Sequence, residues 1–295
     1  MHVGNMNLSK VETGAQLLAR LGSRPSIQGI EDTLFLDGPN VKDVYELYGV
    51  EGSGKTELLL SLVTSILLPK DWNGYNLNGA NAGVIFIDTD YKLQILRLVN
   101  IMEKRIMVKT EHDKLDTNKK MSSNDIEVLV KECLKKIMIV RCTSSFQLLV
   151  TLHSLESTIS NNPDIAVIMI DSISAFYWID RCNGGENIGA QETNMNHIVK
   201  QLSKLINNYN LVLFATKALN FKKTNKENEL KGGNCASPSE KKVLKDNHAE
   251  FLCKSWYKFV KHRLIFHKEK SFSVYCNSLN IDIQFTVNEG GICFK

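Results

Sequence analysis

The chain has 295 residues, of which 43% are hydrophobic and 23% are charged, and its formal net charge at pH 7 is +4. These values are typical of a globular protein with a substantial core. So mild a charge indicates by itself neither a nucleic-acid-binding protein nor a membrane-surface protein. The longest apolar stretch, residues 58–68, is too short to span a bilayer. No signal peptide is visible, and we expect a soluble protein without a membrane partner.

The seven cysteines are scattered along the chain, and none of them is spaced as C-x-x-C. This pattern argues against a disulfide framework and against a structural zinc site. We expect reduced thiols in an intracellular protein.

The segment before the first strong strand signal is short. Residues 8–21 have the apolar spacing of a short amphipathic helix, and turn residues follow at 22–25 and 37–40. We predict that residues 1–40 are a short helix and linker without a separate domain, and that residues 41–295 form one core.

The most informative motif is a phosphate-binding loop between a predicted strand and a predicted helix. Its residues are Gly49, Val50, Glu51, Gly52, Ser53, Gly54, Lys55 and Thr56. Glycines let backbone N–H groups surround a phosphate, and the helix start adds a favourable dipole. Lys55 can reach the β and γ phosphates, and Thr56 can bind Mg²⁺. The motif predicts nucleotide binding; the alternative is a glycine-rich turn with an unrelated lysine.

Strands and helices alternate through most of the chain. Continuous apolar strands are predicted at 84–88, 137–140, 165–170 and 211–215, with helices between them. This pattern predicts an α/β fold with a mostly parallel central sheet and helices on both faces. The segments 256–266, 272–276 and 281–287 are expected as antiparallel edge strands toward the C-terminus, and the polar segment 109–124 is expected as a solvated insertion.

Acidic residues follow two of these strands. Asp171 directly follows the strand at 165–170, where an aspartate can hold Mg²⁺ through water beside Thr56; a helix N-cap is the alternative. Asp90 follows the strand at 84–88 and is expected at the same sheet edge. A second acid there favours the RecA branch of P-loop proteins, in which another strand lies between the P-loop strand and the magnesium-binding strand.

A basic loop follows the strand at 211–215. Residues 217–245 hold eight lysines against three glutamates. The loop either contacts a nucleic-acid backbone or is a solvated insertion. The candidate contacts are Lys222, Lys223, Lys226, Lys231, Lys241, Lys242 and Lys245.

The chain resembles the RecA-type recombinase paralogues of eukaryotic homologous-recombination repair. The similar stretches are residues 14–21, 49–57, 86–91, 171–181, 211–216 and 260–263. The resemblance implies a RecA-like P-loop NTPase core with ATP and Mg²⁺ as cofactors. It also implies a nuclear protein whose partners are other recombinase paralogues in a heteromeric complex, with single-stranded or branched DNA contacted through that complex.

Several positions depart from the family pattern. Asp90 stands where the family has its water-activating glutamate. Lys217 stands where the family has the glutamine that senses the γ-phosphate. Gly184 stands where the first DNA-binding loop of the family has an arginine. Arg97 matches an arginine that lies against the adenine. The family's amino-terminal helical domain and Phe-containing linker motif have no counterpart, nor does the acidic segment that caps a neighbour's ATP, near residues 277–278.

These departures predict an ATP-binding subunit of a heteromeric complex that supports double-strand-break repair, with weak or absent hydrolysis, so an enzymatic role is left open. The alternative is an autonomous DNA-dependent ATPase that acts on single-stranded DNA. A P-loop kinase for a small metabolite is disfavoured, because its lid would need arginines and the basic loop holds only lysines.

Overall fold

A computed structural model describes residues 13–14, 17–18, 22–36, 38–112, 121–183, 188–219 and 251–295. The helices are α2 (Lys55–Leu67), α3 (Ile95–His112), α4 (Ser123–Leu134), α5 (Ser145–Asn161), α6 (Tyr177–Asn183), α7 (Ile188–Tyr209) and α9 (Lys254–Phe259). The strands are β1 (Val44–Gly49), β2 (Asp71–Trp72), β3 (Tyr75–Asn76), β4 (Gly83–Asp88), β5 (Ile137–Arg141), β6 (Ile165–Asp171), β7 (Val212–Ala218), β8 (His262–Lys268), β9 (Phe272–Cys276), β10 (Ile281–Asn288) and β11 (Gly291–Phe294).

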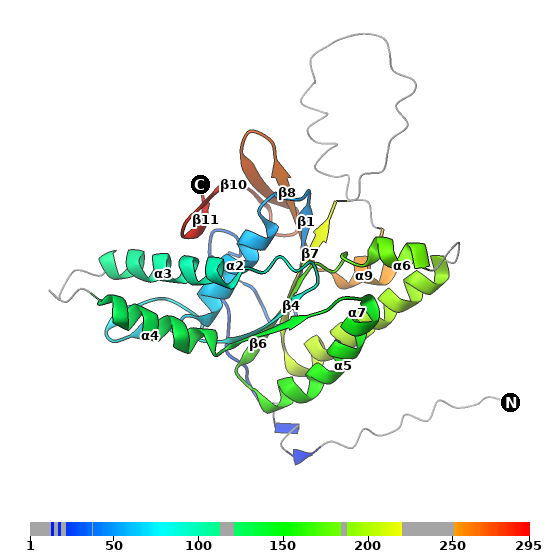
Figure 1. Ribbon diagram of the computed structural model, residues 1–295, viewed down its shortest axis with the longest axis horizontal. Coiled ribbons are helices and arrows are strands. Elements are labelled where there is room, and N and C mark those ends of the chain that lie inside the picture. The colour runs from blue at the N-terminus through cyan, green and yellow to red at the C-terminus, as the bar shows by residue number, and fades with distance from the viewer. Residues whose placement is uncertain are drawn as a thin grey trace, which may run out of the picture.

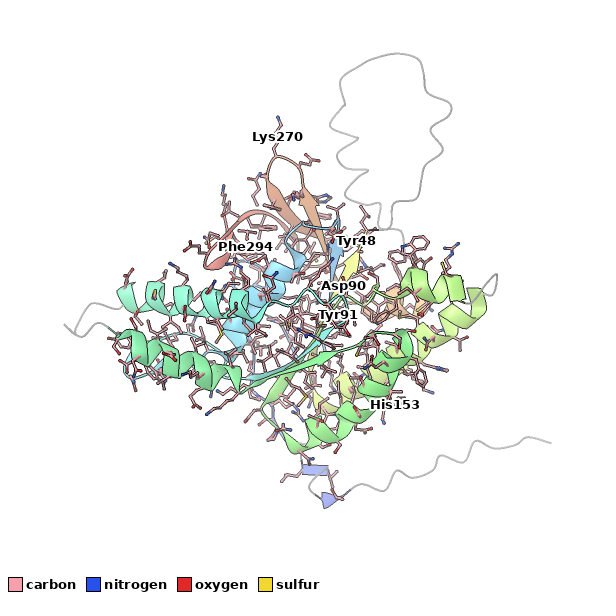
Figure 2. The ribbon with its side chains drawn as sticks, in the orientation of Figure 1. Tyr48, Asp90, Tyr91, His153, Lys270 and Phe294 are labelled. Carbon is pink, nitrogen blue, oxygen red and sulfur yellow. The ribbon has the colours of Figure 1, made fainter. Side chains whose placement is uncertain are left out.

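In the described part of the chain, one large sheet has the strand order β11-β10-β9-β8-β1-β7-β6-β4-β5 (Figure 1). Neighbouring strands from β8 to β5 are parallel, whereas β8 to β11 pair antiparallel. Lys270 marks the tip of the hairpin between β8 and β9 (Figure 2). The predicted fold class is confirmed, and so is the order expected for the RecA branch, because β7 lies between β1 and β6.

Helices cover both faces of the parallel strands (Figure 1). In β4, Val84 and Phe86 pack with α2, α3 and α4 on one face, whereas Ile85 and Ile87 pack with α5 and α7 on the other. Because both faces are buried, the four consecutive residues 84–87 of this strand are apolar, rather than alternate ones only.

The segment before β1 packs against the core. Ile27, Leu34 and Phe35 are buried in the cluster that surrounds α2. The Arg24 guanidinium donates to the carbonyl oxygens of Ile159 at 2.9 Å and Ile165 at 2.8 Å, which attaches this segment to the end of α5. The division of the chain at residue 40 stays a prediction. The predicted helix at 8–21 lies mostly outside the described residues.

The structure corrects the prediction of a strand that begins at Trp256. Lys254–Phe259 is helix α9, and Cys253 caps it by accepting a hydrogen bond from the Trp256 backbone N–H. The Trp256 side chain is fully buried. The burial of this side chain accompanies a helical turn, although the residue types of the segment favour a strand. The strand that follows, β8, pairs parallel with β1 rather than antiparallel.

Two other predictions also need correction. We expected a buried strand at 137–140, but β5 is the edge strand, and Met138 and Ile139 are each 36% exposed. The segment 109–124 is not all insertion, because α3 continues to His112 and α4 begins at Ser123. Ser122 and Asp125 form a capping box at the start of α4, which a polar composition conceals.

A buried carboxylate connects β1 to its neighbours. Glu46 is completely buried and accepts hydrogen bonds from Arg263 Nε at 2.7 Å and from the Trp256 indole N–H. The Lys217 ammonium lies 3.5 Å from the same carboxylate and is equally buried. These contacts connect β1, β7, β8 and α9, since a buried charge needs partners from every side.

Replacing Arg263 by methionine tests this cluster. Arg263→Met removes one charged partner of Glu46, so we expect the free energy of unfolding to fall by about 3 kcal/mol, as for other broken buried ion pairs. Urea unfolding followed by circular dichroism measures the change. The control is Lys131→Met, which breaks the exposed pair with Glu127 and should cost less than about 1 kcal/mol. Equal losses in both variants would contradict a structural role for the cluster.

Candidate nucleotide-binding site

The loop between β1 and α2 has a backbone that only glycine accommodates. Gly54 has φ +98°, and a Cβ there would lie 2.9 Å from the Phe285 ring. A Cβ on Gly49 would lie 2.6 Å from the Phe266 carbonyl oxygen. Gly54 is also the N-cap of α2 and makes no side-chain cap, so the first N–H groups of the helix are left for a ligand. This geometry fits an anion.

The Lys55 ammonium lies over the loop. It donates hydrogen bonds to the carbonyl oxygens of Gly49 at 2.9 Å and Val50 at 2.7 Å. Burial lowers the pKa of Lys55 to about 8, and the nearby Asp171 carboxylate opposes this shift. A bound phosphate would favour the charged ammonium, because an adjacent negative charge stabilises it.

The two predicted magnesium ligands lie together. The Thr56 hydroxyl donates to one oxygen of Asp171 at 2.8 Å, and the Thr216 hydroxyl donates to the other. Within the described residues there is no group of three or more His, Cys, Asp or Glu side chains that could hold a metal. The donor set therefore fits Mg²⁺ that takes most of its ligands from phosphates and water, with Asp171 acting through water.

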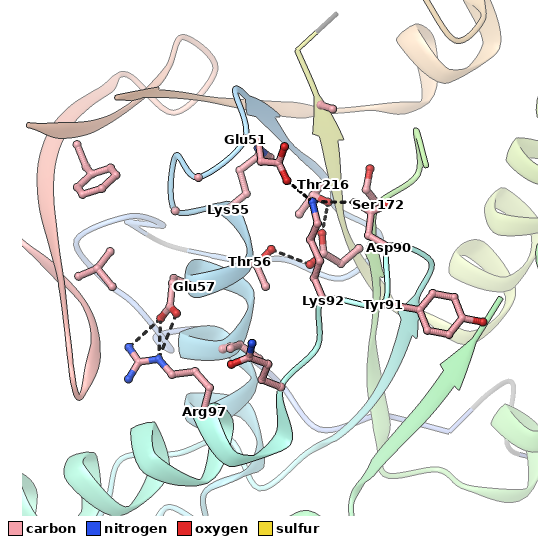
Figure 3. A pocket seen from close by; sticks show the side chains of 18 residues that line it. Glu51, Lys55, Thr56, Glu57, Asp90, Tyr91, Lys92, Arg97, Ser172 and Thr216 are labelled. Atoms are coloured by element: carbon pink, nitrogen blue, oxygen red, sulfur yellow. Dashed lines mark hydrogen bonds and ion pairs between the residues drawn. The ribbon is translucent and has the colours of Figure 1, made fainter. Parts of the chain in front are cut away.

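A carboxylate and a lysine follow β4. Asp90 lies in the pocket, and the Lys92 ammonium lies 3.9 Å from it and 2.7 Å from Glu51 of the loop (Figure 3). Burial raises the pKa of the Asp90 carboxyl, and Lys92 opposes the rise. A raised pKa makes the ionised Asp90 carboxylate a stronger base, while its role in hydrolysis stays a prediction.

Lys217 does not reach this pocket. Its neighbours Thr216 and Ala218 line the cavity, but successive side chains in a strand point to opposite faces. The Lys217 ammonium instead lies in the buried cluster with Glu46, 4.7 Å from the centre of the Phe251 ring. The expectation that Lys217 occupies the sensor position is therefore wrong for its side chain.

Arg97 lines the pocket and is held by two elements. Its guanidinium donates to both oxygens of Glu57, at distances from 2.9 to 3.3 Å. It also donates to the backbone carbonyls of Asn288 at 2.6 Å and Glu289 at 2.9 Å. Arg97 thus attaches the turn between β10 and β11 to α2 and α3, while its contact with a base stays a prediction.

The cavity bounded by these elements has a volume of about 690 Å³, which lies in the range of small-molecule sites. Charged and hydroxyl groups surround the phosphate loop, and apolar side chains of Leu60, Phe272 and Val287 line part of the wall. Its size and mixed lining fit a nucleotide with an anionic and a less polar end.

Some predicted residues cannot be placed. The seven lysines of the basic loop and Gly184 lie outside the described residues. Among the helices that the structure describes, none combines the length and the hydropathy needed to cross a membrane.

Comparison with known proteins decides the family. The sequence model of the family described as Rad51 matches residues 28–246. The chain belongs to the Rad51 family. It is 36% identical to the DNA repair protein XRCC2 of Mus musculus over 300 residues, which cover 97% of this chain and 98% of that protein.

Two other Rad51-family relatives are less similar. The DNA repair protein XRCC2 homolog of Arabidopsis thaliana is 28% identical over 302 residues, with 88% of this chain and 78% of that protein covered. The DNA repair and recombination protein RadA of Metallosphaera sedula is 23% identical over 210 residues, with 71% of this chain and 52% of that protein covered. Rad51-family proteins generally bind ATP with Mg²⁺, and the pocket described above is consistent with that property.

Sequence reasoning missed several pocket residues. Thr216 lies near the carboxyl end of β7, as Asp171 lies at the end of β6, so the same rule about strand ends would have found it. Lys92 is a single lysine in a loop and had no signal of its own. Phe272 and Val287 enter the pocket only because the last strands fold back over α2.

The lowered pKa of Lys55 predicts how nucleotide affinity depends on pH. Lys55 is charged below about pH 8 and loses its proton above it. A bound triphosphate requires the charged form, so the association constant should fall by up to about tenfold per pH unit above 8. Isothermal titration with Mg–ATP between pH 7 and 9.5 measures this fall.

The control for this measurement is Lys55→Arg, because a guanidinium stays protonated throughout this range. Its affinity should be nearly independent of pH, whatever its absolute value. The hydrogen bond with Glu51 raises the pKa of Lys92, in the direction opposite to the shift of Lys55. An affinity of the unmodified chain that stays constant up to pH 9.5 would contradict the role given to Lys55.

Proposed function

We propose that this chain is an ATP-binding subunit of a heteromeric complex of recombinase paralogues. It acts in the nucleus and supports double-strand-break repair by homologous recombination. Its own ATP hydrolysis is weak or absent. One observation carries the proposal. Lys55, Thr56 and Asp171, which would hold a magnesium nucleotide, line one pocket, whereas Lys217 lies outside it.

Binding follows from groups that are already in place. The N–H groups at the start of α2 and the Lys55 ammonium would hold the phosphates, and Thr56 and Asp171 would hold the ion. Mg²⁺, when bound, supplies positive charge next to the phosphates. None of these steps requires a group that the pocket lacks.

Hydrolysis depends on the position of one carboxylate. Asp90 is one methylene shorter than glutamate, which leaves its oxygens about 1 Å or more short of the reach of a glutamate. A misplacement of about 1 Å can reduce a rate on the order of a hundredfold. Slow turnover therefore follows from geometry, even though the pKa of Asp90 is raised.

Lengthening this side chain tests the explanation. Asp90→Glu should raise the turnover of ATP by about tenfold or more, because it restores the missing reach. Phosphate release from the purified chain measures the rate, and Asp90→Asn serves as the control without a base. Turnover of the unmodified chain that matches a strand-exchange recombinase, or no rise in Asp90→Glu, would contradict the explanation.

An assembly with partners is supported by the relatives and by the sheet edge. Among the described strands, none pairs with the outer side of β5, and two of its apolar side chains are partly exposed. An open edge of this kind offers backbone N–H and C=O groups to a strand of another protein. The edge supports assembly with another chain, and membership of the Rad51 family makes other recombinase paralogues the expected partners.

Purification of the tagged chain from its own cells tests the assembly. We expect other Rad51-family proteins in stoichiometric amounts, and their absence would contradict the proposal.

Lys55→Ala should weaken nucleotide binding more than it weakens repair. The alternative of an autonomous DNA-dependent ATPase predicts that single-stranded DNA stimulates hydrolysis by the isolated chain, with a salt dependence that the lysines of the basic loop produce.

A further inference from the structure

Lys92 brings a second ammonium group into the pocket. Its Nζ lies 2.7 Å from Glu51 Oε1 and 3.9 Å from Asp90 Oδ2, so it spans the space between the phosphate loop and the end of β4 (Figure 3). The charged groups that act on it are Glu51, Asp90 and Asp171. Lys92 lies near enough to Lys55 to lower the pKa of Lys55. Two lysines from different elements therefore share one phosphate site.

The pair between Lys92 and Glu51 is easily exchanged. The Lys92 side chain is 50% exposed and that of Glu51 is 83% exposed. Exposed pairs of this kind contribute little, because water screens them and two long side chains lose freedom. A phosphate group carries more charge than a carboxylate and accepts stronger hydrogen bonds from an ammonium. A phosphate that enters the pocket would therefore displace Glu51 as the partner of Lys92.

The position of Lys92 selects one phosphate among three. Leu60, Phe272 and Val287 belong to the apolar part of the pocket wall. Lys92 lies instead beside Asp90, at the strand edge where Asp88 of β4 pairs with Asp171 of β6. Thr56 and Asp171 would hold the ion that accompanies the end of a triphosphate, so a cation at this edge would lie near the terminal phosphate.

We propose that Lys92 is a second phosphate-binding lysine, which leaves Glu51 and contacts the terminal phosphate of a nucleoside triphosphate. This inference rests on the proposed nucleotide-binding function. Because this contact needs a third phosphate, Lys92 makes the site prefer a triphosphate over a diphosphate. The cation that does so belongs to the same chain as the phosphate loop.

The affinities of Lys92→Ala for two nucleotides test this inference. The affinity for a non-hydrolysable ATP analogue should fall by about tenfold or more, whereas that for ADP should change by less than about twofold. Isothermal titration of the full chain measures both. The matched control is Lys104→Ala, because Lys104 is also 50% exposed and paired with a glutamate, Glu289, but does not line the pocket. It should change neither affinity.

Two further variants complete the test. Lys92→Arg keeps the charge and should keep the preference for the triphosphate. Glu51→Gln removes the competing carboxylate and should raise the affinity for the triphosphate. Equal loss of both affinities in Lys92→Ala, or loss of neither, would overturn the inference while leaving the proposed function intact. No binding of either nucleotide by the unmodified chain would overturn the proposed function, and this inference with it.

Discussion

The buried carboxylate of Glu46 is the constraint on which the rest of the structure depends. It lies in β1, directly before the phosphate loop, and its partners come from both neighbouring strands and from α9. A charge without water must be satisfied completely, so Arg263, Trp256 and Lys217 have fixed places around it. The same contacts hold β7 and β8 against β1, and thereby fix where the loop and the two Mg²⁺ candidate ligands meet. They also keep Lys217 on the face of the sheet away from the nucleotide pocket.

Under the proposed function, the pocket binds a nucleotide and hydrolyses it slowly. Thr56, Asp171 and Thr216 are already connected by hydrogen bonds, so little reorganisation would accompany the binding of an ion and phosphates. Asp90, in contrast, is short for a base that must reach a water molecule, and Lys92 is near enough to pair with it. We therefore propose that the site retains a nucleotide, as a structural part of an assembly, rather than turning it over.

The sequence predicted the features that follow from local rules. The loop at Gly49–Thr56, the strand–helix alternation and the place of Asp171 each depend on residues close in sequence, or on the general rule about strand ends. It did not predict those that depend on packing between distant segments. Trp256 lies within α9, and its buried indole N–H donates to Glu46, 210 positions earlier. The face to which Lys217 points depends on the register of its strand, which a shift of one residue would invert.

The measurement that tests the central claim most directly follows the nucleotide itself. The chain, purified without its partners, is loaded with radiolabelled ATP and freed of excess nucleotide. It is then incubated at length, and the bound nucleotide is identified. We expect intact triphosphate to stay bound and Lys55→Ala to retain none. Recovery of diphosphate and free phosphate, at a rate similar to that of a strand-exchange recombinase tested alongside, would contradict it.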